Sequence, residues 1–94
     1  MPQRMIDKIR ESIRNGNYDM TEHAIEEMAE DELGIFEVEE AILKGEVIEI
    51  EKDDPGGNKY VVRGRGFSRF TEIGVVGRFK ETGIFLIITV YKII

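Results

Sequence analysis

The sequence predicts an α+β fold in which about three N-terminal helices pack on one face of a four-stranded antiparallel sheet. Apolar residues recur at helical spacing as far as Lys44, and they alternate with polar residues from Gly45 onward. No strand–helix–strand alternation is present to build a parallel sheet. The chain of 94 residues has no evident linker or repeat, so we expect residues 1–94 to form a single domain.

Each helix is predicted from apolar residues that share one helix face. Ile6, Ile9 and Ile13 fall at i, i+3 and i+7 in the first helix. Asp19 or Thr21 can cap the second helix, and glycines follow the ends of all three helices. The expected helices cover residues 2–15, the segment from this cap to Gly34, and residues 36–44.

Four strands are predicted after Gly45, where the period of apolar residues changes to two. In the first strand, Ile48 and Ile50 are expected on one face, with Val47 and Glu49 on the other. Turn-forming residues at 53–58 separate it from the second strand. The last strand is apolar on both faces, which favours an interior position in the sheet. The expected strands are residues 47–51, 59–65, 70–79 and 84–92.

The net charge of −6 is unevenly distributed along the chain. Residues 1–51 carry fifteen acids and five bases, whereas residues 52–94 carry four acids and eight bases. Only the second half could attract a polyanion, unless the two halves neutralise each other where they touch. Without cysteine and with a single histidine, the chain is expected to hold no metal site and no cofactor.

The N-terminal residues lack the pattern of a signal peptide. The longest apolar run, which begins at Ile84, is much shorter than the ~20 residues that a membrane-spanning helix needs. We therefore expect a cytoplasmic protein that makes no contact with a membrane.

Several short stretches between residues 21 and 91 carry a family resemblance through their order and spacing. They are Thr21-x-His23-Ala24, Gly45-Glu46-Val47-Ile48-Glu49, Lys59-Tyr60-x-Val62-x-Gly64 and Ile88-Thr89-Val90-Tyr91. The chain resembles a family of small prokaryotic proteins, classed as a domain of unknown function, often found near mobile or defence genes. That family is distantly similar to the RelE, ParE and BrnT toxins, whose ribonuclease members present basic residues of the sheet to RNA. The resemblance implies RNA as a ligand and an antitoxin-like protein as a partner.

The sheet half of the sequence gathers arginine, lysine and aromatic residues. Guanidinium groups bind phosphates with two hydrogen bonds and aromatic rings stack on bases, so this combination is typical of single-stranded RNA sites. The same cations could instead be solvated or could pair with the acidic helices. The expected nucleic-acid-binding residues are Tyr60, Arg63, Arg65, Arg69 and Lys80.

Three further residues are candidates for catalysis of RNA cleavage. Arg78 would stabilise charge on the phosphorane, and Tyr91 or His23 would transfer the proton. Histidine is the residue type best suited to proton transfer at neutral pH. The alternative role for His23 is structural, because a histidine in the first turn of a helix often bonds to the nearby backbone.

The sequence leaves two functions open. The first is a toxin-like RNA-binding protein, or an endoribonuclease, that uses a basic sheet face. The second is a non-catalytic protein-interaction module that forms homodimers through the apolar last strand and Ile93-Ile94.

Overall fold

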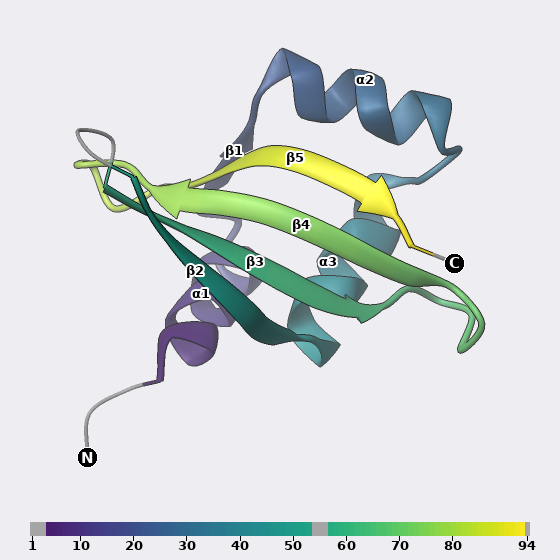
Figure 1. Cartoon of the computed structure of the whole chain (residues 1–94), viewed down its shortest axis with the longest axis horizontal. Helices are drawn as coiled ribbons and strands as arrows, with labels where there is room; N and C mark the ends of the chain where they lie inside the picture. The colour runs from purple at the N-terminus through teal and green to yellow at the C-terminus, as the bar shows by residue number, and fades with distance from the viewer. Residues whose placement is uncertain (1–3, 54–56, 94) are drawn as a thin grey trace.

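The computed structural model describes residues 4–53 and 57–93. Figure 1 shows three helices packed against one twisted sheet. The elements are α1 (Met5–Arg14), β1 (Tyr18–Met20), α2 (Glu22–Glu30), α3 (Ile35–Lys44), β2 (Glu46–Asp53), β3 (Gly57–Arg65), β4 (Glu72–Phe79) and β5 (Phe85–Lys92). The α+β class is confirmed, whereas the prediction of four antiparallel strands is wrong.

The sheet has five strands in the order β1-β5-β4-β3-β2. β1 runs parallel to β5, with Tyr18 opposite Phe85, and the other neighbours are antiparallel. β1 lies between α1 and α2 in the chain, so the helices do not all precede the strands. Its three residues, with Asp19 in the middle, are too few to show an alternating pattern.

The predicted helices differ from the observed ones mainly at their ends. Thr21, not Asp19, caps α2, because its Oγ1 accepts a hydrogen bond of 3.1 Å from the amide of Ala24. The predicted start of the first helix at Pro2 falls outside the described residues, and α1 begins at Met5. No helix in the described ranges is both long enough and apolar enough to cross a membrane.

One hydrophobic core lies between the helices and a single face of the sheet. Ile9 of α1, Ala24 of α2 and Ile42 of α3 are fully buried. The sheet contributes residues from β3, β4 and β5, including Tyr60, Val62, Ile73, Val75, Phe85, Ile87 and Val90. Burial of one such aliphatic or aromatic side chain contributes roughly 1.5–3 kcal/mol. In Figure 1, β3 and β4 pass in front of α3, so the opposite face of the sheet is turned to the viewer.

Two glycines allow the backbone at the end of α3 to pack directly against the backbone of β3. A Cβ on Gly64 would lie 1.9 Å from the carbonyl oxygen of Ala41, and one on Gly45 would lie 2.6 Å from the carbonyl oxygen of Arg63. Arg10 of α1 completes this junction by donating a hydrogen bond of 2.6 Å to the Gly45 carbonyl. The glycines of the Gly45-Glu46-Val47 and Val62-x-Gly64 stretches are therefore explained by backbone packing.

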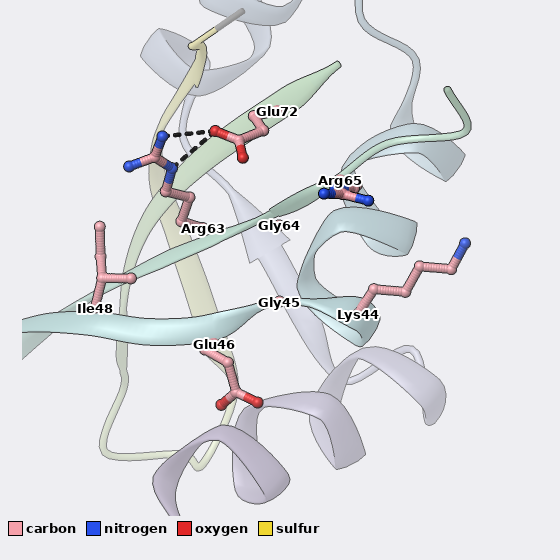
Figure 2. Close-up of a pocket in the computed structure, with 8 residues that line it drawn as sticks. All are labelled: Lys44, Gly45, Glu46, Ile48, Arg63, Gly64, Arg65 and Glu72. Carbon is pink, nitrogen blue, oxygen red and sulfur yellow. Dashed lines mark hydrogen bonds and ion pairs between the residues drawn. The ribbon is translucent and has the colours of Figure 1, made fainter. Parts of the chain in front are cut away.

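A β-bulge in β2 changes which faces its residues occupy. The register shifts between Val47 and Glu49, so Val47 pairs with Val62 and Ile50 pairs with Tyr60 on the core side. The extra residue, Ile48, points to the same side as Arg63 (Figure 2). The prediction that Ile48 and Ile50 share a face is therefore wrong, because a bulge interrupts strict alternation.

Candidate functional site

The sheet face opposite the helices, called the open face below, carries most of the cationic residues that the sequence singled out. Side chains alternate between the two faces of each strand, so residues whose neighbours in the strand face the helices belong to this face, and Val61 among them is only 5% exposed. They are Lys59, Val61, Arg63 and Arg65 of β3, Glu72, Gly74, Val76 and Arg78 of β4, and Leu86, Thr89 and Tyr91 of β5.

Arg63, Gly74 and Tyr91 form one row across the open face. Gly74 pairs with Arg63 on one side and with Tyr91 on the other. The Tyr91 ring fills the space above Gly74, since a Cβ there would lie 2.1 Å from Cζ and 2.5 Å from Oη. Neighbouring strands are ~4.8 Å apart, so the hydroxyl of Tyr91 extends from β5 over β4 toward Arg63.

The guanidinium of Arg63 is oriented by a carboxylate. Its Nε and Nη2 donate to Oε2 of Glu72 at 3.0 and 2.6 Å, as the dashed lines in Figure 2 mark. Both side chains are partly exposed, so solvent screens the pair. Arg65, two residues further along β3, forms no ion pair with any described residue. A guanidinium that already binds a carboxylate oxygen presents the geometry that would bind a phosphate oxygen.

A depression of about 420 Å³ lies beside this row, at the end of β3 where α3 meets β2. Gly45 and Gly64 form its floor, and charged side chains of both signs surround it (Figure 2). Its lining residues are Lys44, Gly45, Glu46, Ile48, Arg63, Gly64, Arg65 and Glu72. The cations of β3 at this end of the sheet are Arg63 and Arg65, whereas Lys44 of α3 extends away from them and its Nζ lies 3.3 Å from Oε1 of Glu40.

The loop between β3 and β4 adds exposed aromatic rings at the same end. Phe67 and Phe70 are 65% and 72% exposed, and the Arg69 guanidinium lies 5.0 Å from the centre of the Phe70 ring. Tyr60, the aromatic residue expected to bind nucleic acid, instead lies in the core with 8% exposure and packs edge-on against Phe79. The aromatic surface available for stacking is therefore the loop and not Tyr60.

The remaining predicted cations lie at the opposite end of the sheet. Arg78 pairs in register with Leu86, and Lys80 Nζ lies 3.8 Å from a carboxylate oxygen of Asp19. β4 has eight residues, and at ~3.3 Å per residue its ends are roughly 25 Å apart. The cations that are near in sequence are thus divided into two groups, and Arg63, rather than Arg78, shares a row with Tyr91.

His23 lies on α2 and is largely exposed. Its Nε2 is 3.3 Å from Oε1 of Glu27, and the same oxygen accepts a hydrogen bond of 3.2 Å from the Val90 amide. This amide points away from β4, whereas the ring of Tyr91 extends over β4. His23 and the Tyr91 hydroxyl therefore lie on opposite sides of β5. Within the described ranges, no three or more His, Cys, Asp or Glu side chains form a group that could hold a metal ion.

Comparison with models of protein families gives a match over most of the chain. The model of a family described as "Domain of unknown function (DUF4258)" matches residues 20–92, which run from the end of β1 to the end of β5. Every residue of the open face lies within this segment. Searches of curated proteins and of solved structures gave no match.

Proposed function

The chain belongs to the DUF4258 family, and from this premise we propose that it binds single-stranded RNA on the open face of its sheet. The binding site is the end of the face that carries Arg63, Arg65 and Tyr91. The observation that carries the proposal is the row of Arg63, Gly74 and Tyr91, in which the residue with the guanidinium and the residue with the phenol flank the same glycine on one face of the sheet. The resemblance to RelE, ParE and BrnT toxins supports the same choice of ligand.

The chemistry of the site suits a phosphate backbone with unpaired bases. Arg63 takes a phosphate oxygen in place of the Glu72 carboxylate, and Arg65 supplies a second cation two residues away. Phe67 and Phe70 offer exposed rings beyond the end of β3 on which bases stack. Stacking requires unpaired bases, so single strands are favoured over duplexes.

The acidic half of the chain restricts where RNA can bind. Residues 1–51, which include all three helices and most of β2, carry ten more acids than bases. α1 and α3 lie on the other side of the sheet from the open face, and α2 lies beyond the edge of β5 (Figure 1). Like-charge repulsion from the helical side therefore leaves the open face as the surface that a polyanion can approach.

If bound RNA is cleaved, the groups in the central row would carry the reaction. Arg63 would stabilise the charge that develops on the phosphorane, and the Tyr91 hydroxyl in the same row would transfer a proton. His23 takes no part in this proposed step because it lies beyond the opposite side of β5. A toxin-like endoribonuclease would therefore use the same site that we propose for RNA binding.

Binding is tested by fluorescence anisotropy of a labelled single-stranded RNA at several salt concentrations. We expect Arg65→Ala to weaken binding at least fivefold and to lower the salt slope by about 0.7 for each phosphate that the variant no longer neutralises. Glu72→Gln should strengthen binding, because it removes the carboxylate that competes for Arg63. Arg14→Ala is the matched control, since it removes an exposed cation from α1 instead.

Equal effects of Arg14→Ala and Arg65→Ala would contradict a site on the open face, and absence of binding at low salt would eliminate RNA as the ligand. Gel analysis of the same RNA, with Tyr91→Phe as the catalytic variant, separates binding from cleavage.

The alternative function, a homodimeric interaction module, is tested by the same preparation. β5 lies between β1 and β4, so docking through this strand would use its open face and not an edge. Light scattering that gives twice the mass of one chain, with no RNA binding, would favour this module. Ile94, part of the surface expected from the sequence, lies outside the described residues.

A further inference from the structure

The two sides of the sheet differ in how their outer backbone groups are covered. On the β5 side, β1 pairs with the first residues of the strand, and α2 supplies partners for the rest. Thr21 Oγ1 donates to the Ile88 carbonyl, Glu27 accepts from the Val90 amide, and Asp31 accepts from the Lys92 amide. On the other side, β2 has β3 as its single neighbouring strand among the described residues. The other outer strand, β1, has only three residues, whereas β2 has eight, so β2 offers the longer edge at which the sheet can be extended.

Burial along β2 is incomplete on both faces. Ile48 on the open face is 54% exposed, and Ile50 on the helix side is 50% exposed. Isoleucines of the inner strands show the contrast, since Ile73 and Ile87 have at most 1% exposure. An added strand next to β2 would cover the half-exposed Ile50, because its own side chains would also alternate between the faces.

The charges of β2 determine which kind of strand fits. Glu49 and Glu51 lie on the open face, and neither forms an ion pair with a described residue. Antiparallel pairing of two copies centred on Ile50 would place Glu49 of each copy opposite Glu51 of the other. Like charges directly opposite each other destabilise a strand pair. The same acids that oppose pairing of two copies therefore attract a strand with Lys or Arg at alternate positions.

We infer that the edge of β2, over residues Glu49–Asp53, binds an extended basic segment of a partner protein by β-strand addition. Backbone hydrogen bonds to the unpaired edge supply most of the affinity. Lys or Arg side chains of the segment lie against Glu49 and Glu51, and its apolar side chains on the other face cover Ile50. The bulge at Val47 and Glu49 sets one end of the pairing region, since the regular register with β3 begins there.

The experiment uses the whole chain and a labelled peptide of alternating Lys and Val, capped at both ends. We expect binding in the micromolar range at about 50 mM salt, weakened at least fivefold at about 300 mM. The same peptide with N-methyl groups on alternate residues loses backbone donors while keeping its charge, and it should bind at least tenfold more weakly. Amide chemical shifts and hydrogen exchange should change along β2.

Matched protein variants separate the edge from the general negative charge of the chain. Glu49→Lys with Glu51→Lys should abolish peptide binding. Glu26→Lys with Glu30→Lys makes the same change of charge on an exposed face of α2 and should leave most of the binding intact. The proposed RNA site does not include Glu49 or Glu51, so failure of either proposal is seen independently of the other.

Three results with the peptide would overturn the inference. The first is that the N-methylated peptide binds as tightly as the unmodified one, and the second is that amide chemical shifts change only in α2. The third is that the peptide does not bind at low salt, in which case the acids and the bulge serve only to protect the edge from other strands. A dimer in solution whose interface contains β2 would also overturn it.

Discussion

Gly74 has no side chain, and this leaves room on the sheet for the ring of Tyr91. The Tyr91 ring occupies the space above it, and the atoms that an added Cβ would meet are at the far end of the tyrosine side chain. The contrast is Gly64, where an added Cβ would meet the backbone carbonyl of Ala41. A mobile ring can move aside, whereas the end of α3 cannot move without displacing the helix.

The substitutions Gly74→Ala and Gly64→Ala should therefore differ sharply. We expect Gly74→Ala to cost about 1 kcal/mol of unfolding free energy and Gly64→Ala about 3 kcal/mol or more, because only the second moves backbone. Urea unfolding measures both values, and the ring resonances of Tyr91 should shift in Gly74→Ala. Equal destabilisation by the two variants would show that the Tyr91 ring is not free to move.

Tyr18 makes the free energy of unfolding depend on pH in the alkaline range. Burial, and then the hydrogen bond of 2.5 Å that it donates to Glu39, raise the pKa of Tyr18 above its ordinary value near 10. The folded state keeps this proton longer than the unfolded state does. Its contribution to stability is therefore complete below about pH 10 and is lost as the pH rises further.

Tyr18→Phe should reduce the fall of unfolding free energy above about pH 10, because it removes the group that titrates differently in the two states. At neutral pH it should cost about 1–2 kcal/mol, since Glu39 loses its donor. Denaturant unfolding of both proteins between neutral pH and about pH 11 gives the two slopes. Parallel slopes would contradict the role assigned to Tyr18.

At the scale of elements, α2 stabilises the edge of β5 with carboxylates. Glu27 of α2 accepts a hydrogen bond from the Val90 amide, and Asp31, the C-cap residue of α2, accepts one from the Lys92 amide, so side chains satisfy two donors of the strand. This arrangement gives Glu27 a structural role at the edge of β5, and His23 Nε2 lies 3.3 Å from the same carboxylate.

Glu27→Ala should cost about 1–3 kcal/mol, because it leaves the Val90 amide without an acceptor. Glu27→Gln keeps an acceptor oxygen and should recover most of that loss. Hydrogen exchange of the Val90 amide, measured by NMR, should accelerate in the alanine variant alone. Unchanged exchange there would show that this bond does not protect the edge.

The solvent side of α2 carries repulsive charge. Glu22, Glu26 and Glu30 are exposed and follow each other at i, i+4 spacing. Replacement of the middle residue, Glu26→Lys, converts two like-charge pairs into two attractive ones. We expect it to raise the unfolding free energy by about 0.5–1 kcal/mol at low salt, with about half the gain for Glu26→Gln. A gain that persists at about 0.5 M salt would rule out a charge effect.

At the scale of the whole molecule, the first and last strands complete the sheet together. Residues 18–20 of β1 pair with residues 85–87 of β5, and β5 buries Phe85, Ile87 and Val90. A fragment of residues 1–83 should therefore show no cooperative thermal transition by circular dichroism, because both β1 and the core lose their partner strand. A cooperative transition in that fragment would mean that the core forms without β5.

Sequence periodicity alone determined the fold class, the approximate positions of three helices, and the shared face of Arg63 and Arg65. It also indicated that Tyr60 lies on the face opposite these arginines, because Tyr60 is an odd number of residues from both. Tyr60 is predicted to bind RNA because it is aromatic, although the alternation of side chains places it on the other face from the arginines. Its ring lies in the core, as the alternation predicts. These features depend on residues within a few positions of each other.

Tertiary structure alone decided the row of Arg63, Gly74 and Tyr91, the separation of Arg69 from Lys80, and the strand β1. Each depends on strand register or on pairing between segments far apart in the chain. Register is set by turns, by the bulges in β2 and between β4 and β5, and by packing of the helices on one face. Hydrophobic periodicity is local, so it specifies which face a residue occupies, whereas the neighbour that it meets across the sheet is fixed only when the strands pair.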